Sequence, residues 1–192
     1  SQEDFNVLRA ADIVMSALPI CPIRKISYAT FTILNADLSG DVRMVEMGSP
    51  GFLYFRKGRC ESLPYEELHS ENWHDRTMKL SRFRVEVGDR IVFFSDGISQ
   101  AGLGTRMYPL GWSEKRCRDF VATVLKARED ISSQELCELI MTEAINKEQD
   151  RTCHDDMSCA AVYVRSTRRL LLFTGPPYNA DRDRECALYL DY

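Results

Sequence analysis

Residues 92–104 read VFFSDGISQAGLG, and residues 154–164 read HDDMSCAAVYV. Each segment contains a short apolar run that predicts a buried strand, and each carries acidic residues at one end of that run. Asp96 directly follows the first strand, whereas Asp155 and Asp156 precede the second. If these strands are neighbours in one sheet, the carboxylates converge at one sheet edge and offer the oxygen ligands that Mg²⁺ and Mn²⁺ prefer. The alternative is that one site is only a tight turn and the other only a polar lead-in to a strand.

The rest of the chain carries helix and strand patterns around these two segments. Apolar residues at three- and four-residue spacing predict a helix over 4–18, and Ser132 with Glu135 forms a capping box that begins a later helix. Residues 60–79 are polar and irregular, so we expect a surface excursion there. Further strands are expected at 26–34, 42–47, 52–56, 83–87 and 170–173, a glycine-containing loop at 98–112, another helix between that loop and Ser132, and a helical tail at 181–191. Hairpin-linked strands combined with helices predict an α+β fold.

Composition and length limit the class of protein. The chain has 192 residues, 25 basic and 29 acidic, so its net charge is −4. This length predicts one domain with an adequate core. The mild acidity argues against a general nucleic-acid or anionic-membrane binder, and no apolar run approaches the about 20 residues of a membrane-spanning helix. The acidic start lacks a signal-peptide pattern, and the seven cysteines include no C-x-x-C pair. We therefore expect a cytoplasmic protein whose thiols are mostly small core residues.

Two other segments look like ligand-binding motifs, and both are better explained as turns. Residues 35–46 match the spacing of an EF-hand calcium loop, but β-branched strands flank them and Arg43 adds a positive charge. A hairpin turn is therefore the better account. Gly175 begins a Gly-Pro-Pro run after an apolar strand, yet prolines lack the amide donors that cradle phosphate, so a structural turn is expected there.

The two acidic segments, with GDR at 88–90 just before the first, resemble the last two motifs of PPM-type metal-dependent Ser/Thr protein phosphatases. The closer likeness is to the SpoIIE-like bacterial branch, which residues 25–58 also resemble through a paired-strand unit and its G-S-P turn. The resemblance covers residues 3 to about 165. It implies an α-β-β-α sandwich of two antiparallel sheets flanked by helices. We accordingly expect the phosphatase domain over 1–165 and the start of a β-α extension over 166–192.

The resemblance also implies site residues and cofactors. Asp96 and Asp155 occupy metal-ligand positions and are the expected catalytic residues, while Gly97, His154 and Asp156 are expected beside them. The complete domain of this family holds two Mn²⁺ or Mg²⁺ ions at one sheet edge. Two such cations lower the pKa of a bridging water and neutralise the phosphate oxygens during in-line attack. This mechanism needs no covalent enzyme nucleophile.

The implied function is hydrolysis of phosphoserine or phosphothreonine on a regulatory protein in bacterial signalling. In the SpoIIE-like branch the usual substrate is a phosphorylated regulator of the anti-sigma-factor-antagonist type, which makes such a protein the expected partner. The family also carries a D-G-x-G element before its first helix, and this element is absent from the chain. We expect either that it lies upstream or that the fold is a degenerate phosphatase serving as a non-catalytic protein-binding module.

Overall fold

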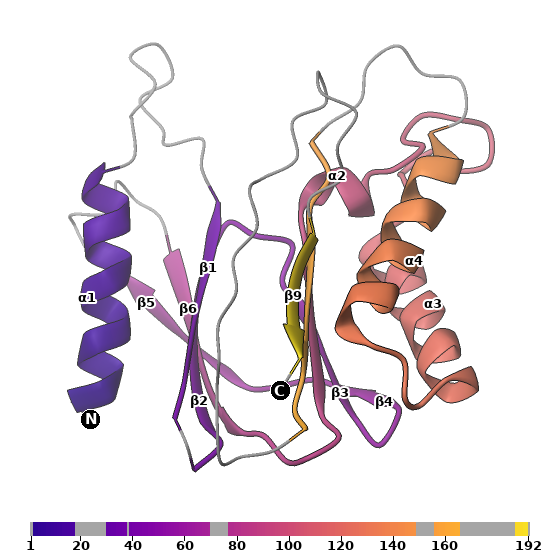
Figure 1. Cartoon of the computed structure of the whole chain (residues 1–192). Coiled ribbons are helices and arrows are strands. Elements are labelled where there is room, and N and C mark those ends of the chain that lie inside the picture. Colours follow the sequence, from indigo (N-terminus) through magenta and orange to yellow (C-terminus); the bar gives the residue numbers. More distant parts are fainter. Residues whose placement is uncertain are drawn as a thin grey trace, which may run out of the picture. The chain divides into compact units, whose positions relative to one another are not determined.

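The computed structural model describes residues 2–17, 30–37, 39–69, 77–148, 156–165 and 187–191. The chain forms two compact units, each containing one sheet and at least one helix (Figure 1). Unit 1 comprises Ser1–Ser49 and Leu63–Val85, and unit 2 comprises Pro50–Ser62 and Glu86–Tyr192. The chain therefore passes between the units three times, after Ser49, Ser62 and Val85.

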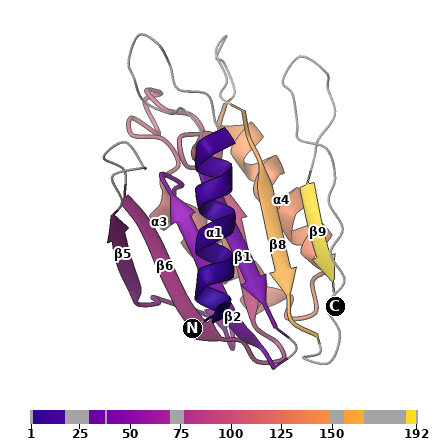
Figure 2. The same ribbon diagram turned by 90° about the vertical axis from the view of Figure 1, so that its left-hand side faces the viewer.

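The described residues of unit 1 form one helix and four strands: α1 (Gln2–Ala17), β1 (Phe31–Ala36), β2 (Asp41–Met47), β5 (Tyr65–His69) and β6 (Thr77–Arg84). The strands form an antiparallel sheet in the order β1-β2-β6-β5, and α1 lies across it (Figure 2). Val7, Ala11 and Met15 form the buried face of α1 and pack with apolar residues of β2 and β6. This four-residue spacing confirms the helix that was predicted near the start of the chain.

Unit 2 contains the remaining elements: β3 (Phe52–Arg56), β4 (Arg59–Glu61), β7 (Arg90–Phe94), α2 (Asp96–Ser99), α3 (Glu114–Ala127), α4 (Ser133–Lys147), β8 (Cys159–Tyr163) and β9 (Ala187–Asp191). The sheet order is β4-β3-β7-β8-β9, and all pairs are antiparallel except β8 with β9. Helices α3 and α4 lie side by side over one face of this sheet (Figure 1). The α+β fold class is confirmed.

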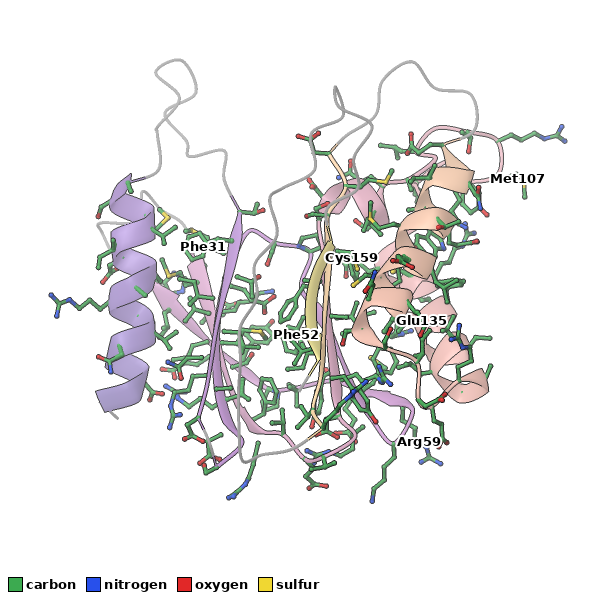
Figure 3. All side chains as sticks on the ribbon, viewed as in Figure 1. Phe31, Phe52, Arg59, Met107, Glu135 and Cys159 are labelled. Carbon is green, nitrogen blue, oxygen red and sulfur yellow. The ribbon has the colours of Figure 1, made fainter. Side chains whose placement is uncertain are left out.

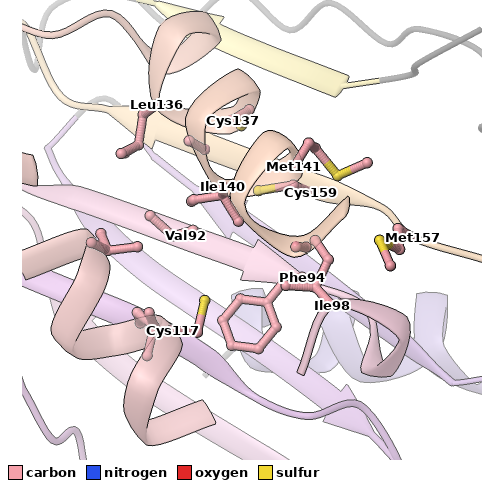
Figure 4. Packing of buried hydrophobic residues seen from close by; sticks show 14 of the residues in the cluster. Val92, Phe94, Ile98, Cys117, Leu136, Cys137, Ile140, Met141, Met157 and Cys159 are labelled. Atoms are coloured by element: carbon pink, nitrogen blue, oxygen red, sulfur yellow. The ribbon is translucent and has the colours of Figure 1, made fainter. Parts of the chain in front are cut away.

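The core of unit 2 fills the space between its sheet and these helices. Figure 4 shows β7 and α2 contributing Val92, Phe94 and Ile98, which pack with residues of α4. Three free cysteines, Cys117, Cys137 and Cys159, are buried in the same cluster. Burial raises the pKa of Cys117 to about 12, so this thiol stays protonated. These three cysteines are small core residues, as predicted.

The start of α4 confirms the predicted capping box. The Ser132 hydroxyl accepts a hydrogen bond from the Glu135 amide at 3.1 Å, and the Glu135 carboxylate accepts one from the Ser132 amide at 3.2 Å. Arg128 adds an ion pair to Glu135 at 2.7 Å. The two reciprocal bonds satisfy amides that have no partner inside the helix, which is why the helix begins at this point.

The irregular structure predicted over 60–79 is wrong where the structure describes it, whereas the predicted surface position is confirmed for β4 and β5. This stretch contributes β4, β5 and the beginning of β6. The separate strand expected at 83–87 is correct only for residues 83 and 84, because β6 ends at Arg84. Both β4 and β5 are edge strands, and most of their side chains are exposed. An edge strand with few buried side chains carries no alternating apolar pattern, so its sequence looks like that of a loop.

The helix predicted over 181–191 is also wrong at its described end. Residues Ala187–Asp191 form β9, which pairs in parallel with β8. Pairing with an existing sheet edge overrides a weak local helical pattern. The domain boundary near residue 165 stays a prediction.

The hairpin turn predicted in place of a calcium loop is confirmed. One Asp37 carboxylate oxygen accepts hydrogen bonds from the Ser39 amide, the Ser39 hydroxyl and the Asp41 amide, at 2.6 to 3.0 Å. It therefore closes the connection between β1 and β2. The strand expected at 26–34 is described from residue 30 onward and contains β1, whereas residues 26–29, the strand expected at 170–173 and the Gly175 turn lie outside the described residues. None of the helices within the described ranges is long and apolar enough to span a membrane.

Candidate active site

The two acidic segments belong to neighbouring strands. Strands β7 and β8 pair antiparallel, and Phe94 at the end of β7 lies opposite Cys159 at the beginning of β8. The residues that follow β7 and those that precede β8 therefore meet at the same side of the sheet, where these two central strands end and begin. We call this side the candidate edge, as distinct from the edge strands. The strand adjacency on which the predicted convergence of carboxylates depends is confirmed.

Ser95 connects these two segments directly. Its amide donates a hydrogen bond to the carbonyl of Ser158 at 3.0 Å. Its hydroxyl donates to the carbonyl of Asp156 and accepts from the amide of Ser158, both at 3.0 Å. We call these three bonds the Ser95 link. Sequence reasoning missed Ser95 and Ser158, although both lie in the two motifs, because their contact depends on the register of two strands that are far apart in the sequence.

Asp96 is the first residue of α2, and its side chain is exposed at this edge. Its backbone carbonyl accepts hydrogen bonds from the Gln100 amide at 2.7 Å and the Ser99 hydroxyl at 3.1 Å. Within the part of the chain that the structure describes, its carboxylate has neither a hydrogen-bond donor nor an ion-pair partner. The fully buried side chain of Ile98 fixes α2 in the core beneath it. The carboxylate therefore sits on a fixed backbone and is available to a ligand.

The other predicted site residues are only partly described. Gly97 is buried within α2, and Asp156 is exposed just before β8. His154 and Asp155 lie outside the described residues. Among the residues that are described, no group of three or more histidine, cysteine, aspartate or glutamate side chains could hold a metal ion. Asp96 has the right chemistry for a hard cation, and the assignment of Asp96 and Asp155 as metal ligands stays a prediction.

Hydrogen bonds attach the segment that follows α2, residues 102–112, to α2 and to the end of α4. The Ser113 amide at its end donates to the Ser99 carbonyl of α2 at 2.7 Å. The Gly102 amide at its beginning donates to the Glu148 carboxylate at 2.8 Å, and Glu148 is the residue at the end of α4. At Gly111 (φ +78°), an added Cβ would lie 2.7 Å from Cα of Gln100. We call residues 102–112 the α2–α3 loop.

The opposite edge of the same sheet holds a separate charged network. Asp89 is buried, accepts a hydrogen bond from the Tyr54 hydroxyl at 2.5 Å and forms an ion pair with Arg56 at 2.8 Å. Burial and this carboxylate raise the pKa of Tyr54. A cavity of about 320 Å³ lies beside them, lined also by Arg90 and Tyr163. Because Asp89 has these partners at the other end of β7, we assign the network to stability of the fold.

The family described as Stage II sporulation protein E (SpoIIE) matches residues 6–165 of the sequence. The chain belongs to the SpoIIE family. The match includes both acidic segments and the strands that carry them, and it confirms the family resemblance drawn from those segments.

Solved structures of SpoIIE agree in fold. The phosphatase domain of the cell-fate determinant SpoIIE from Bacillus subtilis, presoaked with manganese, matches with a TM-score of 0.53 and 18% identity, over 81% of this chain and 64% of that one. A second structure of that domain matches with a TM-score of 0.51 and 16% identity, over 85% of this chain and 72% of that one. The chain thus spans about two thirds of the first domain. A comparison with curated proteins finds no match.

This SpoIIE-family chain therefore has the fold of a phosphatase domain, with two sheets flanked by helices. The candidate edge is formed by the end of β7, the beginning of β8 and α2, all within unit 2.

Proposed function

We propose that this chain is a metal-dependent phosphatase that hydrolyses phosphoserine or phosphothreonine on a regulatory protein. The observation that carries the proposal is the position of Asp96. Its carboxylate is exposed, without a partner among the described side chains, at a sheet edge that the Ser95 link joins to the segment entering β8. Membership of the SpoIIE family supports this assignment.

The chain's own residues have distinct roles in this proposal. Asp96 and Asp155 would hold Mn²⁺ or Mg²⁺, and the bound ions would activate a water and neutralise phosphate charge. Ser95 fixes the backbone beside both acidic residues through the link. Ile98 anchors α2, so that the carboxylate of Asp96 keeps its position when a substrate arrives. Such preorganisation avoids reorganisation during the reaction.

The proposed partner is a phosphorylated regulator of the anti-sigma-factor-antagonist type in the cytoplasm. Support comes from membership of the SpoIIE family and from the acidic composition of the chain, which argues against a nucleic-acid substrate. His154, Gly97 and Asp156 would flank the ions.

The test is hydrolysis of p-nitrophenyl phosphate and of a phosphoserine peptide by the full natural chain, with Mn²⁺ and with EDTA. We expect Mn²⁺-dependent turnover that EDTA abolishes, and a fall of at least about a hundredfold in Asp96→Asn, because a metal ligand is lost. The matched control is Asp130→Asn, an exposed aspartate in the turn between α3 and α4, which should retain full activity.

Two results would overturn the proposal. Activity that persists in EDTA and in Asp96→Asn would exclude a metal centre at this edge. Manganese binding measured by calorimetry without any turnover would instead favour a phosphatase fold that serves as a protein-binding module.

A further inference from the structure

The tip of the α2–α3 loop exposes two large apolar side chains. Met107 is 75% exposed and Leu110 is 83% exposed, the highest values among the large hydrophobic residues that the structure describes as exposed. Figure 3 shows Met107 pointing away from the rest of unit 2. Both side chains lie on one loop, three positions apart in the sequence, and exposed apolar surface that is continuous marks interaction sites.

The loop that carries them is ordered by its own hydrogen bonds. The Gly104 amide donates to the Tyr108 carbonyl at 3.1 Å, and the Gly111 amide donates to the same carbonyl at 3.0 Å. The Tyr108 amide donates to the Thr105 hydroxyl at 3.1 Å. A loop already fixed in one conformation loses little entropy when a partner binds. These bonds therefore prepare Met107 and Leu110 for contact.

The base of the loop is equally well held. Trp112 is buried, and the ammonium group of Lys147 lies 4.5 Å from the Trp112 ring centroid and 5.5 Å from that of Tyr108. Lys147 also pairs with Glu143 along α4. These contacts fix the loop to the end of α4, while the Ser113–Ser99 hydrogen bond fixes it to α2. The loop is thus attached to the element that begins with Asp96.

The charged groups on the outer part of the loop and over its Tyr108 ring are positive, whereas the acidic Glu148 is bound to the Gly102 amide at the base of the loop. Arg106, exposed next to Met107, is the sole charged residue of the loop in the sequence. Arg116 of α3 places its guanidinium group 5.3 Å from the Tyr108 ring centroid. A partner that fits this surface has an apolar patch with negative charge beside it. A folded phosphoprotein fits when it carries acidic side chains beside an apolar patch, away from the phosphorylated residue that enters the site at Asp96.

We propose that the α2–α3 loop is the docking surface for the folded phosphoprotein substrate. Met107 and Leu110 contact an apolar patch of the substrate outside its phosphorylated residue, and Arg106 contacts its negative charge. This inference rests on the proposed function and adds the surface that selects a protein over a small phosphate ester. The loop acts in binding and not in the chemical step.

The first experiment places a photo-crosslinking amino acid at position 107 of the full natural chain in its host cells. The matched control position is Val87, which is 63% exposed and lies just before β7, at the opposite edge of the sheet. We expect position 107, and not position 87, to capture one protein that carries phosphoserine or phosphothreonine. The photo-crosslinking amino acid is placed in the Asp96→Asn background, so that a captured partner keeps its phosphate. Capture of a second copy of this chain, of an unphosphorylated protein or of nothing would then overturn the proposal.

The second experiment compares Met107→Ser/Leu110→Ser with Val87→Ser on two substrates, the captured phosphoprotein and p-nitrophenyl phosphate. We expect kcat/KM of the loop variant for the phosphoprotein to fall by about tenfold or more, mainly through KM, because two apolar anchors are lost. Its turnover of p-nitrophenyl phosphate and its Tm should match those of Val87→Ser. Equal losses on both substrates, or no loss on either, would refute docking. Failure of the proposed function would differ, since wild type itself would not hydrolyse p-nitrophenyl phosphate.

Discussion

Replacing Ser95 with alanine removes both side-chain bonds of the Ser95 link and leaves its backbone bond in place. The two bonds are 3.0 Å long and accessible to solvent. At about 0.5–1 kcal/mol each for bonds that water can partly replace, the variant should lose about 1–2 kcal/mol of unfolding free energy. For a chain of this size that corresponds to a fall of about 2–8 °C in Tm. Thermal and urea unfolding measure both quantities.

The same variant should also change the metal requirement. Without the link, the segment entering β8 is less well fixed relative to Asp96, so we expect a higher Mn²⁺ concentration for half-maximal hydrolysis of p-nitrophenyl phosphate. A purely structural role would leave that concentration unchanged. Ser95→Thr keeps the hydroxyl and should restore most of the wild-type behaviour.

Ser99→Ala is the matched control, because Ser99 makes one side-chain bond, to the Asp96 carbonyl within the same helix. If Ser95→Ala and Ser99→Ala have the same Tm and the same Mn²⁺ requirement, the reasoning about the link is wrong.

Three further changes test other parts of the fold. Asp89→Asn weakens a buried ion pair with Arg56 and should cost about 2–4 kcal/mol in urea unfolding; a loss under 1 kcal/mol would show that the pair adds little. In Gly111→Ala the new Cβ would lie 2.7 Å from a backbone atom at φ +78°, so the variant should lose about 1–3 kcal/mol of unfolding free energy. Gly58→Ala should lose less, because its φ is +71° and nothing lies within 4 Å of the new Cβ; equal losses would contradict the close approach at Gly111. The hydrogen bond from Arg128 lowers the pKa of Glu135 below its ordinary 4.5, so Glu135→Gln should destabilise the protein above pH 4.5, and its deficit should shrink as the pH falls through the lowered pKa; a pH-independent deficit in thermal unfolding would refute this.

The central strands and the candidate edge could be predicted from sequence because their signals are local. The apolar run 91–94 and the run after Asp156 are buried strands, and buried strands exclude polar residues. Acidic residues at the ends of these apolar runs therefore stand out in the sequence. The capping box of Ser132 was readable for the same reason, since both partners lie within one turn.

The Ser95 link could not be predicted, because Ser95 and Ser158 are 63 residues apart and their bonds depend on strand register. The edge strands β4 and β5 were missed because pairing on one side only leaves little apolar pattern. The exposure of Met107 and Leu110 was equally hidden. A glycine-rich segment with apolar residues can fold inward or outward, and the direction is decided by long-range bonds such as that between Gly102 and Glu148.

The threefold passage of the chain between the units has a consequence for synthesis on the ribosome. Strand β3 carries the apolar residues Leu53 and Phe55, and its sheet partner β7 begins only at Arg90. At about 5–20 residues per second, β3 waits roughly 2–8 seconds for that partner to be made. During this interval its apolar edge is open to other chains. We therefore expect nascent-chain chaperones to bind this protein while β3 has left the ribosome and β7 has not, and to leave it once β7 has emerged.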